Sequence, residues 1–172
     1  MKQVRALDSA ALERLAIRYV ERFATSRARL VRYLERKLAE RGWSEADAPP
    51  VEALAARLVA LGYVDDAAYA AARERAMARR GLGGRRIAGA LAVDGIDEDL
   101  RAVVAGAHDR VASAVALARR RRLGPFGPPL ADRQARERAM AAFLRAGHAP
   151  ALARRILDTP DEDGLEALRE ES

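Results

Sequence analysis

Arginine is the residue type in this sequence best suited to binding chemistry. Only Lys2 and Lys37 are lysines among the 31 basic residues, and the arginines gather in short clusters. A planar guanidinium binds phosphate or carboxylate groups through two parallel hydrogen bonds. We interpret the clusters as binding surfaces, although any single arginine can equally belong to a solvated helix face. The candidate residues for binding a polyanionic partner such as DNA are Arg27, Arg29, Arg32, Arg79, Arg80, Arg85, Arg86, Arg119, Arg120, Arg121, Arg122, Arg133, Arg136 and Arg138.

The charge is distributed unevenly along the chain. Residues 158–172 hold seven acidic residues and one arginine, a charge of −6. Because the whole chain has a net charge of +6, the remaining residues carry +12. A basic body attracts polyanions such as nucleic acid through counterion release. Aromatic residues make up only 5% of the chain, which argues against base stacking. We therefore expect salt-dependent contacts to phosphates.

The sequence does not indicate catalysis or a bound metal. It has no cysteine, and two isolated histidines, His108 and His148, make a poor metal-ligand set. Asp65 and Asp66 precede a helical pattern, where they fit a helix cap better than an acid–base pair. The glycines at 81–84 lack the preceding strand and the following Lys-Ser or Lys-Thr of a phosphate loop. We expect no enzymatic activity, no cofactor and no metal.

The elements that carry these residues are predicted to be helices only. Apolar residues recur at helical spacing, with glycines, prolines and capping residues between the segments. No segment has the alternation of a strand, so the fold class is all-α. Beyond Pro160 we expect the acidic tail to be disordered. The nine predicted helices cover about residues 10–24, 27–41, 51–61, 66–80, 85–93, 98–107, 108–122, 131–146 and 150–157.

A repeat is visible in the ends of the arginine-rich helices. Gly42, Gly95 and Gly147 are separated by 53 and 52 residues, and each follows an arginine-rich helix and precedes a short apolar one. A fixed period of this size is typical of a tandem helical array. We predict three-helix repeats over residues 1–62, 63–107 and 108–158, followed by an acidic tail at 159–172.

An ordered set of motifs in the middle of the chain resembles the central signature of the RecX family of regulatory proteins. Ser26-Arg27 and Leu30 fit that family's first repeat, and residues 133–147 fit its third, so the resemblance covers about residues 12–157. The central motifs are Leu61-Gly62-Tyr63-Val64-Asp65-Asp66, Tyr69-Ala70, Arg80-Gly81-Leu82-Gly83-Gly84-Arg85-Arg86-Ile87, Leu91 and Gly95-Ile96.

The chain departs from the family pattern at three positions. The family commonly has proline where this chain has Gly84, an acidic residue at Ala90 and a basic residue at Asp94. These differences leave the fold expectation unchanged.

The resemblance implies three tandem three-helix repeats in an elongated, curved molecule that lies in the groove of a RecA filament on single-stranded DNA. It implies inhibition of strand exchange and of ATP hydrolysis, through blocked filament growth or filament destabilisation, and so a role in DNA repair and the SOS response. It implies no enzymatic activity.

Two other functions fit the same residues. One is a standalone helical DNA-binding protein or transcription regulator, because a three-helix unit with an arginine-rich helix resembles a helix-turn-helix. The other is a helical-repeat scaffold for a different protein. We expect a cytoplasmic monomer without membrane contact, because neither a signal peptide nor an apolar run of about 20 residues is visible. The expected partners are the RecA filament, single-stranded DNA and duplex DNA phosphates.

Overall fold

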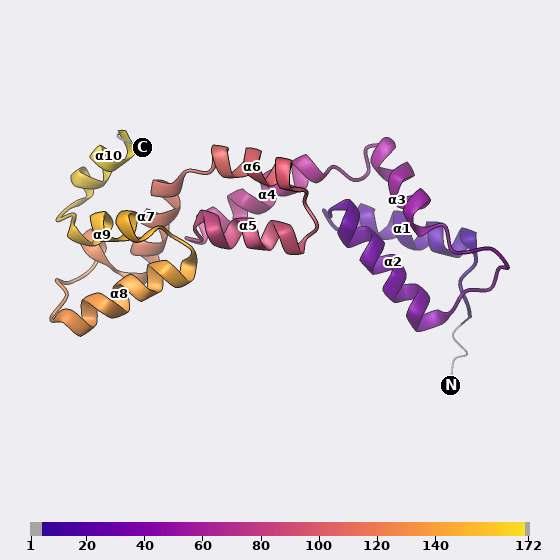
Figure 1. Ribbon diagram of the computed structural model, residues 1–172, viewed down its shortest axis with the longest axis horizontal. Coiled ribbons are helices and arrows are strands. Elements are labelled where there is room, and N and C mark those ends of the chain that lie inside the picture. The colour runs from indigo at the N-terminus through magenta and orange to yellow at the C-terminus, as the bar shows by residue number, and fades with distance from the viewer. Residues whose placement is uncertain (1–4, 171–172) are drawn as a thin grey trace. The chain divides into compact units, whose positions relative to one another are not determined.

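The structure, a computed structural model, describes residues 5–170, apart from the side chain of Arg169. Within these residues the secondary structure is helical, with one isolated parallel bridge between Leu7 and Trp43 (Figure 1). The prediction of an all-α fold is confirmed. None of the helices in this part of the chain is both long enough and apolar enough to cross a membrane.

Ten α-helices and one 3-10 turn lie in the described residues. They are α1 (Ser9–Arg22), α2 (Arg27–Arg41), α3 (Val51–Ala60), α4 (Asp66–Arg79), α5 (Gly84–Val93), α6 (Glu98–Ala107), α7 (Arg110–Arg121), η1 (Gly124–Phe126), α8 (Arg133–Ala146), α9 (Pro150–Asp158) and α10 (Glu162–Glu170).

Polar residues cap the helices where the sequence places them. The side chain of Ser26 accepts a hydrogen bond from the backbone N–H of Arg29 at 3.2 Å, and Asp65 accepts one from Ala68 at 2.9 Å. These bonds satisfy backbone donors that have no partner inside the helix. Asp65 is therefore a helix cap, as expected.

The chain forms two compact units. The first contains the chain up to Ala70 together with Val93–Asp97. In it, α1, α2 and α3 pack around a leucine-rich core (Figure 1). The residues of that core are Leu7, Leu12, Ala16, Leu30, Val31, Leu34, Val51, Leu54, Ala55, Leu58 and Val64.

The second unit contains Ala71–Ala92 and the chain from Glu98 onward. Its core lies among α7, α8, α9 and α10, where Phe143 and Ile156 are completely buried. Both α7 and α8 pack on α9, which therefore underlies the two helices. The chain passes between the two units after Ala70, Ala92 and Asp97 rather than at residues 62 and 107, so the three-repeat division stays a prediction.

Two of the repeated glycines occupy the same kind of junction. Gly95 and Gly147 have φ angles of +79° and +94°, and each follows an arginine-rich helix. A Cβ atom on Gly95 would lie 2.2 Å from the Cβ of Ala28, and one on Gly147 would lie 2.7 Å from the backbone N of Arg86. Each glycine thus lets a helix end approach the first turn of another helix within its own unit.

The acidic tail differs from the expectation of disorder, because it contains helix α10. Glu162 and Asp163 lie in its first turn, where negative charge is favourable. Leu165 and Leu168 share one face and are buried in the core of the second unit. The acidic composition of the tail masked this apolar pair.

Candidate nucleic-acid interface

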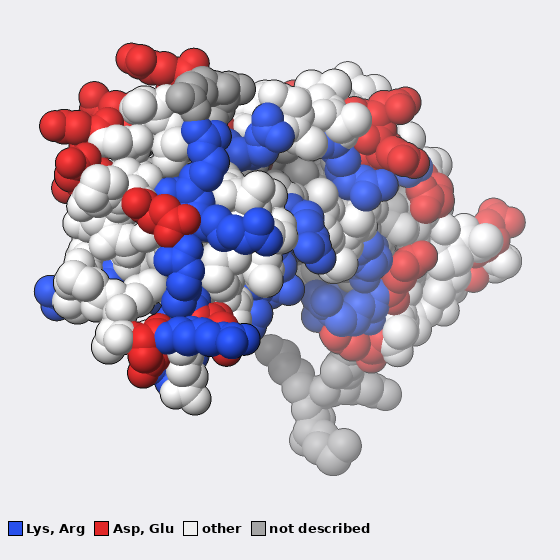
Figure 2. Space-filling view, turned by 60° about the vertical axis from the view of Figure 1, so that its left-hand side comes forward, with Lys and Arg blue, Asp and Glu red and all other residues white. Residues whose placement is uncertain are grey.

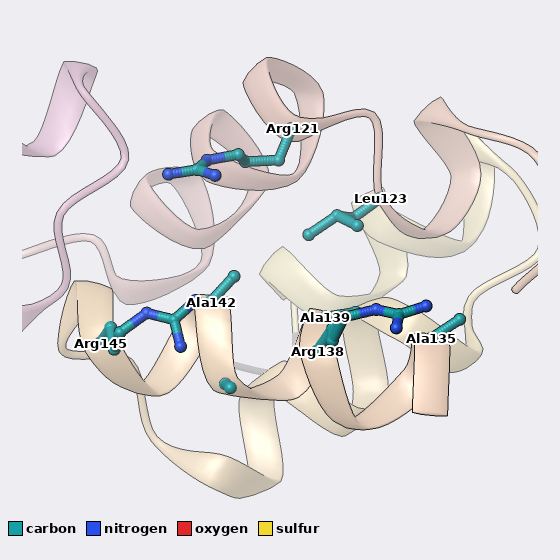
Figure 3. A pocket seen from close by; sticks show the side chains of 8 residues that line it. Arg121, Leu123, Ala135, Arg138, Ala139, Ala142 and Arg145 are labelled. Carbon is teal, nitrogen blue, oxygen red and sulfur yellow. The ribbon is translucent and has the colours of Figure 1, made fainter. Parts of the chain in front are cut away.

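A groove lined by arginines runs along the second unit between α7 and α8. One part of it holds about 430 Å³, and its floor includes Leu123, Ala139 and Ala142. Figure 3 shows Arg121 on the α7 side of this part and Arg138 and Arg145 on the α8 side.

A second hollow of about 230 Å³ continues the first, because both are lined by Arg121, Ala142 and Arg145. It adds Arg80 and Arg120 to the lining, with Leu82, Leu117 and Ala146 as apolar neighbours. Among the residues that the structure describes, no acidic side chain lines either hollow. The two hollows together are called the arginine groove from here on; its arginines are Arg80, Arg120, Arg121, Arg138 and Arg145.

Local sequence places the arginines of the groove. Arg120 and Arg121 belong to the last turn of α7, where basic side chains are favourable at the negative end of the helix dipole. Arg138 and Arg145 are seven residues apart on α8, which is two helical turns and the same face. All of these side chains are exposed.

The side chains of the groove arginines make few contacts with other residues of the protein. Arg120 Nη1 donates to the carbonyl oxygen of Arg80 at 2.6 Å, and Arg138 Nη1 donates to Gln134 Oε1 at 3.0 Å. The side chains of Arg121 and Arg145 make no hydrogen bond or ion pair with the described residues. Their N–H groups are therefore available to a bound anion.

Three predicted candidates belong to the first unit and serve its internal structure. Arg27 pairs with Glu52. Arg29 Nη1 donates to Asp94 Oδ1 at 2.8 Å, and this hydrogen bond raises the pKa of Arg29 above its usual value. Arg32 Nη2 donates to the carbonyl oxygen of Val93 at 2.9 Å.

Three candidates of the second unit are ion-paired outside the groove. Arg119 pairs with Glu162 at 2.9 Å and lies over the ring of Phe126, 4.5 Å from its centroid. Arg133 pairs with Glu137 at 2.8 Å. Arg136 pairs with Asp158 at 2.6 Å. The other predicted candidates lie exposed outside the groove; they are Arg79, Arg85, Arg86 and Arg122.

The charge pattern of the surface agrees with this distribution. Figure 2 shows lysine and arginine side chains gathered in a band on the nearer part of the molecule, with acidic side chains of that part to the left of the band and at its lower end. The sequence clusters thus do form a basic surface in the second unit, but only some of their members line its groove.

Arg145 was not among the residues predicted from the sequence. It stands alone near the end of α8, outside any arginine cluster. Its spacing of seven from Arg138, with Ala142 between them on the same face, was the signal that could have identified it. The prediction relied on arginines that are close together in the sequence, and it therefore missed an arginine that is close to them only in the folded protein.

Sequence reasoning also missed a hydrogen-bonded chain of acid, imidazole and hydroxyl. His108 Nδ1 lies 2.7 Å from Glu74 Oε1, and its Nε2 lies 3.1 Å from Ser113 Oγ. This order resembles a hydrolase triad. However, Ser113 is 1% exposed, so its hydroxyl has no open path to a substrate. We therefore assign these three hydrogen-bonded side chains a structural role, which is to hold α4 against the start of α7.

His148 is buried as well, in agreement with a packing role. Its Nε2 lies 2.9 Å from the carbonyl oxygen of Gly81, and its ring meets the edge of Phe143. Burial lowers the pKa of His148. Among the described residues, no group of three or more histidine, aspartate or glutamate side chains could hold a metal ion.

The fold and the groove define a structural class: an all-helical protein with a basic groove. Comparison with known proteins makes the assignment specific. The chain is 33% identical over 171 residues to the regulatory protein RecX of Myxococcus xanthus (strain DK1622), covering 92% of this chain and 90% of that protein. The chain belongs to the RecX family.

A solved structure agrees on the fold. A crystal structure of a regulatory protein RecX superposes with a TM-score of 0.64 at 22% identity, covering 87% of this chain and 73% of that one. No family model matches the chain.

Proposed function

We propose that this protein binds a RecA filament on single-stranded DNA and inhibits strand exchange and ATP hydrolysis, thereby modulating DNA repair and the SOS response. The observation that carries the proposal is its 33% identity to a RecX regulatory protein across 92% of the chain. The motifs around residues 61–96, which resemble the RecX signature, support the same role.

The arginine groove supports an anionic partner. It offers five exposed arginines, and none of the described residues in its lining is acidic. Arginine forks suit phosphate groups, and attraction to a polyanion grows with the number of counterions released. The protein would act by binding, as a cytoplasmic monomer without enzymatic activity or cofactor.

We further propose that the chain is built from three tandem repeats. The matching junctions at Gly95 and Gly147 support this, since each joins the end of one arginine-rich helix to the start of the preceding one. Gly42 has the same positive φ at the end of α2, but a Cβ atom there would meet nothing within 4 Å. Gly42 therefore has the backbone conformation of the other two glycines without their close approach to another helix.

The test is a titration of the protein into its cognate RecA assembled on single-stranded DNA, with ATP hydrolysis as the readout. We expect inhibition at substoichiometric or near-stoichiometric protein. Unchanged hydrolysis together with no binding to the filament would overturn the proposal.

The second candidate is a standalone DNA-binding protein, and the arginine groove is the observation that favours it. Such a protein would bind duplex DNA tightly in the absence of RecA and would leave the ATP hydrolysis of the filament unchanged. A duplex-binding measurement beside the titration separates the two functions.

A further inference from the structure

A cavity of about 300 Å³ lies in the second unit where α5, α7 and α9 begin. None of the described residues lines both this cavity and the arginine groove. We propose that the cavity binds a small phosphate monoester that carries a hydroxyl group, such as a sugar phosphate. It is called the junction cavity from here on, and its lining includes Gly84, Arg85, His108, Arg110, His148 and Leu152.

Two arginines supply the charge of the junction cavity. Arg85 and Arg110 are exposed, and their side chains make no hydrogen bond or ion pair with the described residues. None of the described lining residues is acidic, and the neighbouring Asp109 is engaged as the N-cap of α7. A phosphate monoester carries a charge of about −1.5 to −2 at pH 7. Two guanidinium groups therefore match it better than they match the single charge of a carboxylate.

The beginning of α9 adds backbone donors to the same cavity. Its N-cap residue, Ala149, offers no side-chain hydrogen bond, and Pro150 follows at the first helical position. The N–H groups of Ala151 and Leu152 therefore have no partner within the helix, and they bond to none of the other described residues. Free N–H groups at the positive end of a helix dipole bind phosphate oxygens.

The imidazole of His148 indicates that the ligand also has a hydrogen-bond donor. Because the carbonyl oxygen of Gly81 can only accept, the nearby Nε2 carries the proton, and burial lowers the pKa of His148 and keeps the ring neutral. Nδ1 is then an acceptor, without a hydrogen-bond partner among the described residues. His148 is only 3% exposed and lines the junction cavity, so a ligand reaches Nδ1 from there. A hydroxyl group of the ligand satisfies it.

The rest of the wall is small or apolar and leaves room beside a phosphate group. Gly84 contributes only backbone, and Ala105 and Leu152 contribute apolar side chains. A volume of about 300 Å³ is at the lower end of the range for ligand pockets, yet a phosphate group alone fills only part of it. A short hydroxylated carbon skeleton joins the phosphate to the acceptor on His148.

The experiment titrates the full chain with glycerol 3-phosphate and with propyl phosphate by calorimetry, at neutral pH and constant ionic strength. The two phosphate monoesters are similar in size, but only the first has hydroxyl groups. We expect one site per chain, with glycerol 3-phosphate bound about tenfold more tightly, because it satisfies a buried acceptor. Glycerate, in which a carboxylate replaces the phosphate, should bind at least tenfold more weakly than glycerol 3-phosphate. Equal affinities for the two phosphates, or for glycerate and glycerol 3-phosphate, would overturn the assigned ligand.

Nitrogen-15 NMR of the histidine rings locates the hydroxyl contact. The chain has only two histidines, so the variant His148→Gln assigns their signals. We expect glycerol 3-phosphate to shift the Nδ1 signal of His148 and to leave its Nε2 signal nearly unchanged, whereas propyl phosphate should have little effect on either. A shift confined to His108, whose nitrogens already contact Glu74 and Ser113, would contradict the acceptor role of His148.

A pair of double variants tests the position of the site. Arg85→Ala with Arg110→Ala removes both unpaired charges and should weaken binding of glycerol 3-phosphate at least tenfold. The matched control, Arg79→Ala with Arg154→Ala, deletes two exposed arginines of the same unit that do not line the junction cavity. We expect the control to bind as tightly as the wild type. Equal losses in the two variants would mean diffuse attraction by the basic surface and would overturn the site.

Gly84→Leu closes the cavity without straining the fold. A Cβ atom on Gly84 would lie 3.5 Å from Cδ2 of His108, an ordinary contact with another lining residue, so the new side chain enters the cavity. Leucine is a good helix former, and the variant should unfold near the wild-type temperature while losing glycerol 3-phosphate. Unchanged binding would overturn the location. Displacement of glycerol 3-phosphate by oligo(dT) at matched ionic strength would assign the cavity to nucleic acid and overturn the proposal.

Discussion

Asp94 provides the sharpest test of how the first unit is held together. Its carboxylate is 6% exposed and lies beside Arg29, whose Nη1 donates to Oδ1 at 2.8 Å. Tyr69 donates its hydroxyl to Oδ2, also at 2.8 Å. Ser26 binds the backbone carbonyl of the same residue and would remain after a side-chain substitution. The change Asp94→Asn therefore removes the charge and keeps the shape.

The magnitude follows from burial. Breaking a buried ion pair costs about 3–5 kcal/mol, and a charged hydrogen bond contributes about 1.5–3 kcal/mol. Because the side chain of Arg29 is 39% exposed, water can replace part of what Asp94 provides. We expect Asp94→Asn to lower the free energy of unfolding by about 2 kcal/mol. In a double-mutant cycle, Tyr69→Phe should couple to it by about 1 kcal/mol.

Trp43 makes the measurement specific, because it is the only tryptophan and packs against the core of the first unit. Urea unfolding followed by tryptophan fluorescence should show a midpoint lowered by about 1 M for Asp94→Asn, given slopes of about 1–3 kcal/mol per M. Asp47→Asn, which changes the same chemical group at an exposed position, is the control. Equal midpoints for the two variants would refute the reasoning.

Three further predictions concern the second unit, whose unfolding can be followed by circular dichroism. Gly147→Ala should destabilise it by about 2 kcal/mol or more, since φ is +94° and the new Cβ would lie 2.7 Å from Arg86 N; an unchanged midpoint would exclude the close junction. The lowered pKa of His148 means that the unfolded chain takes up the proton first, so stability is full above about pH 6.5 and falls as the pH drops toward the lower folded-state pKa. His148→Gln, which keeps a donor for Gly81, should show a weaker fall between about pH 7.5 and 5.5, and an identical fall would assign the effect to other groups. Leu168→Ala should cost about 2 kcal/mol if α10 packs as described, whereas no loss would detach that helix from the core.

Local signals predicted most of the fold. The apolar spacing, the caps at Ser26 and Asp65 and the stop at Gly147 are all properties of neighbouring residues, and each appears where expected. The prediction that the tail is disordered was wrong, and the reason is physical. Its helix depends on burying Leu165 and Leu168 against another part of the chain, and an acidic composition gives no information about that contact.

The candidate site was only partly predictable. The sequence located the basic run at the end of α7, but it could not distinguish an arginine that binds a partner from one that holds the fold. Arg29 and Arg121 look alike in the sequence, yet one meets a buried carboxylate and the other lines an open groove. Asp94 illustrates the same limit. Its difference from the family's basic residue affects a buried hydrogen-bond network with Arg29 and Tyr69, rather than a charged surface.

The acidic tail and the basic body can now be related through particular contacts. From charge alone, a segment of −6 beside a body of +12 could neutralise the binding surface. In the structure, α10 is fixed by two leucines, and its Glu162 pairs with Arg119, which lies outside the arginine groove. Since both members of that pair are 62% exposed, the pair contributes little to stability. The helix thus covers one side of α7 and leaves Arg120 and Arg121 exposed on the groove side. An anionic partner bound in the arginine groove would therefore not have to displace α10.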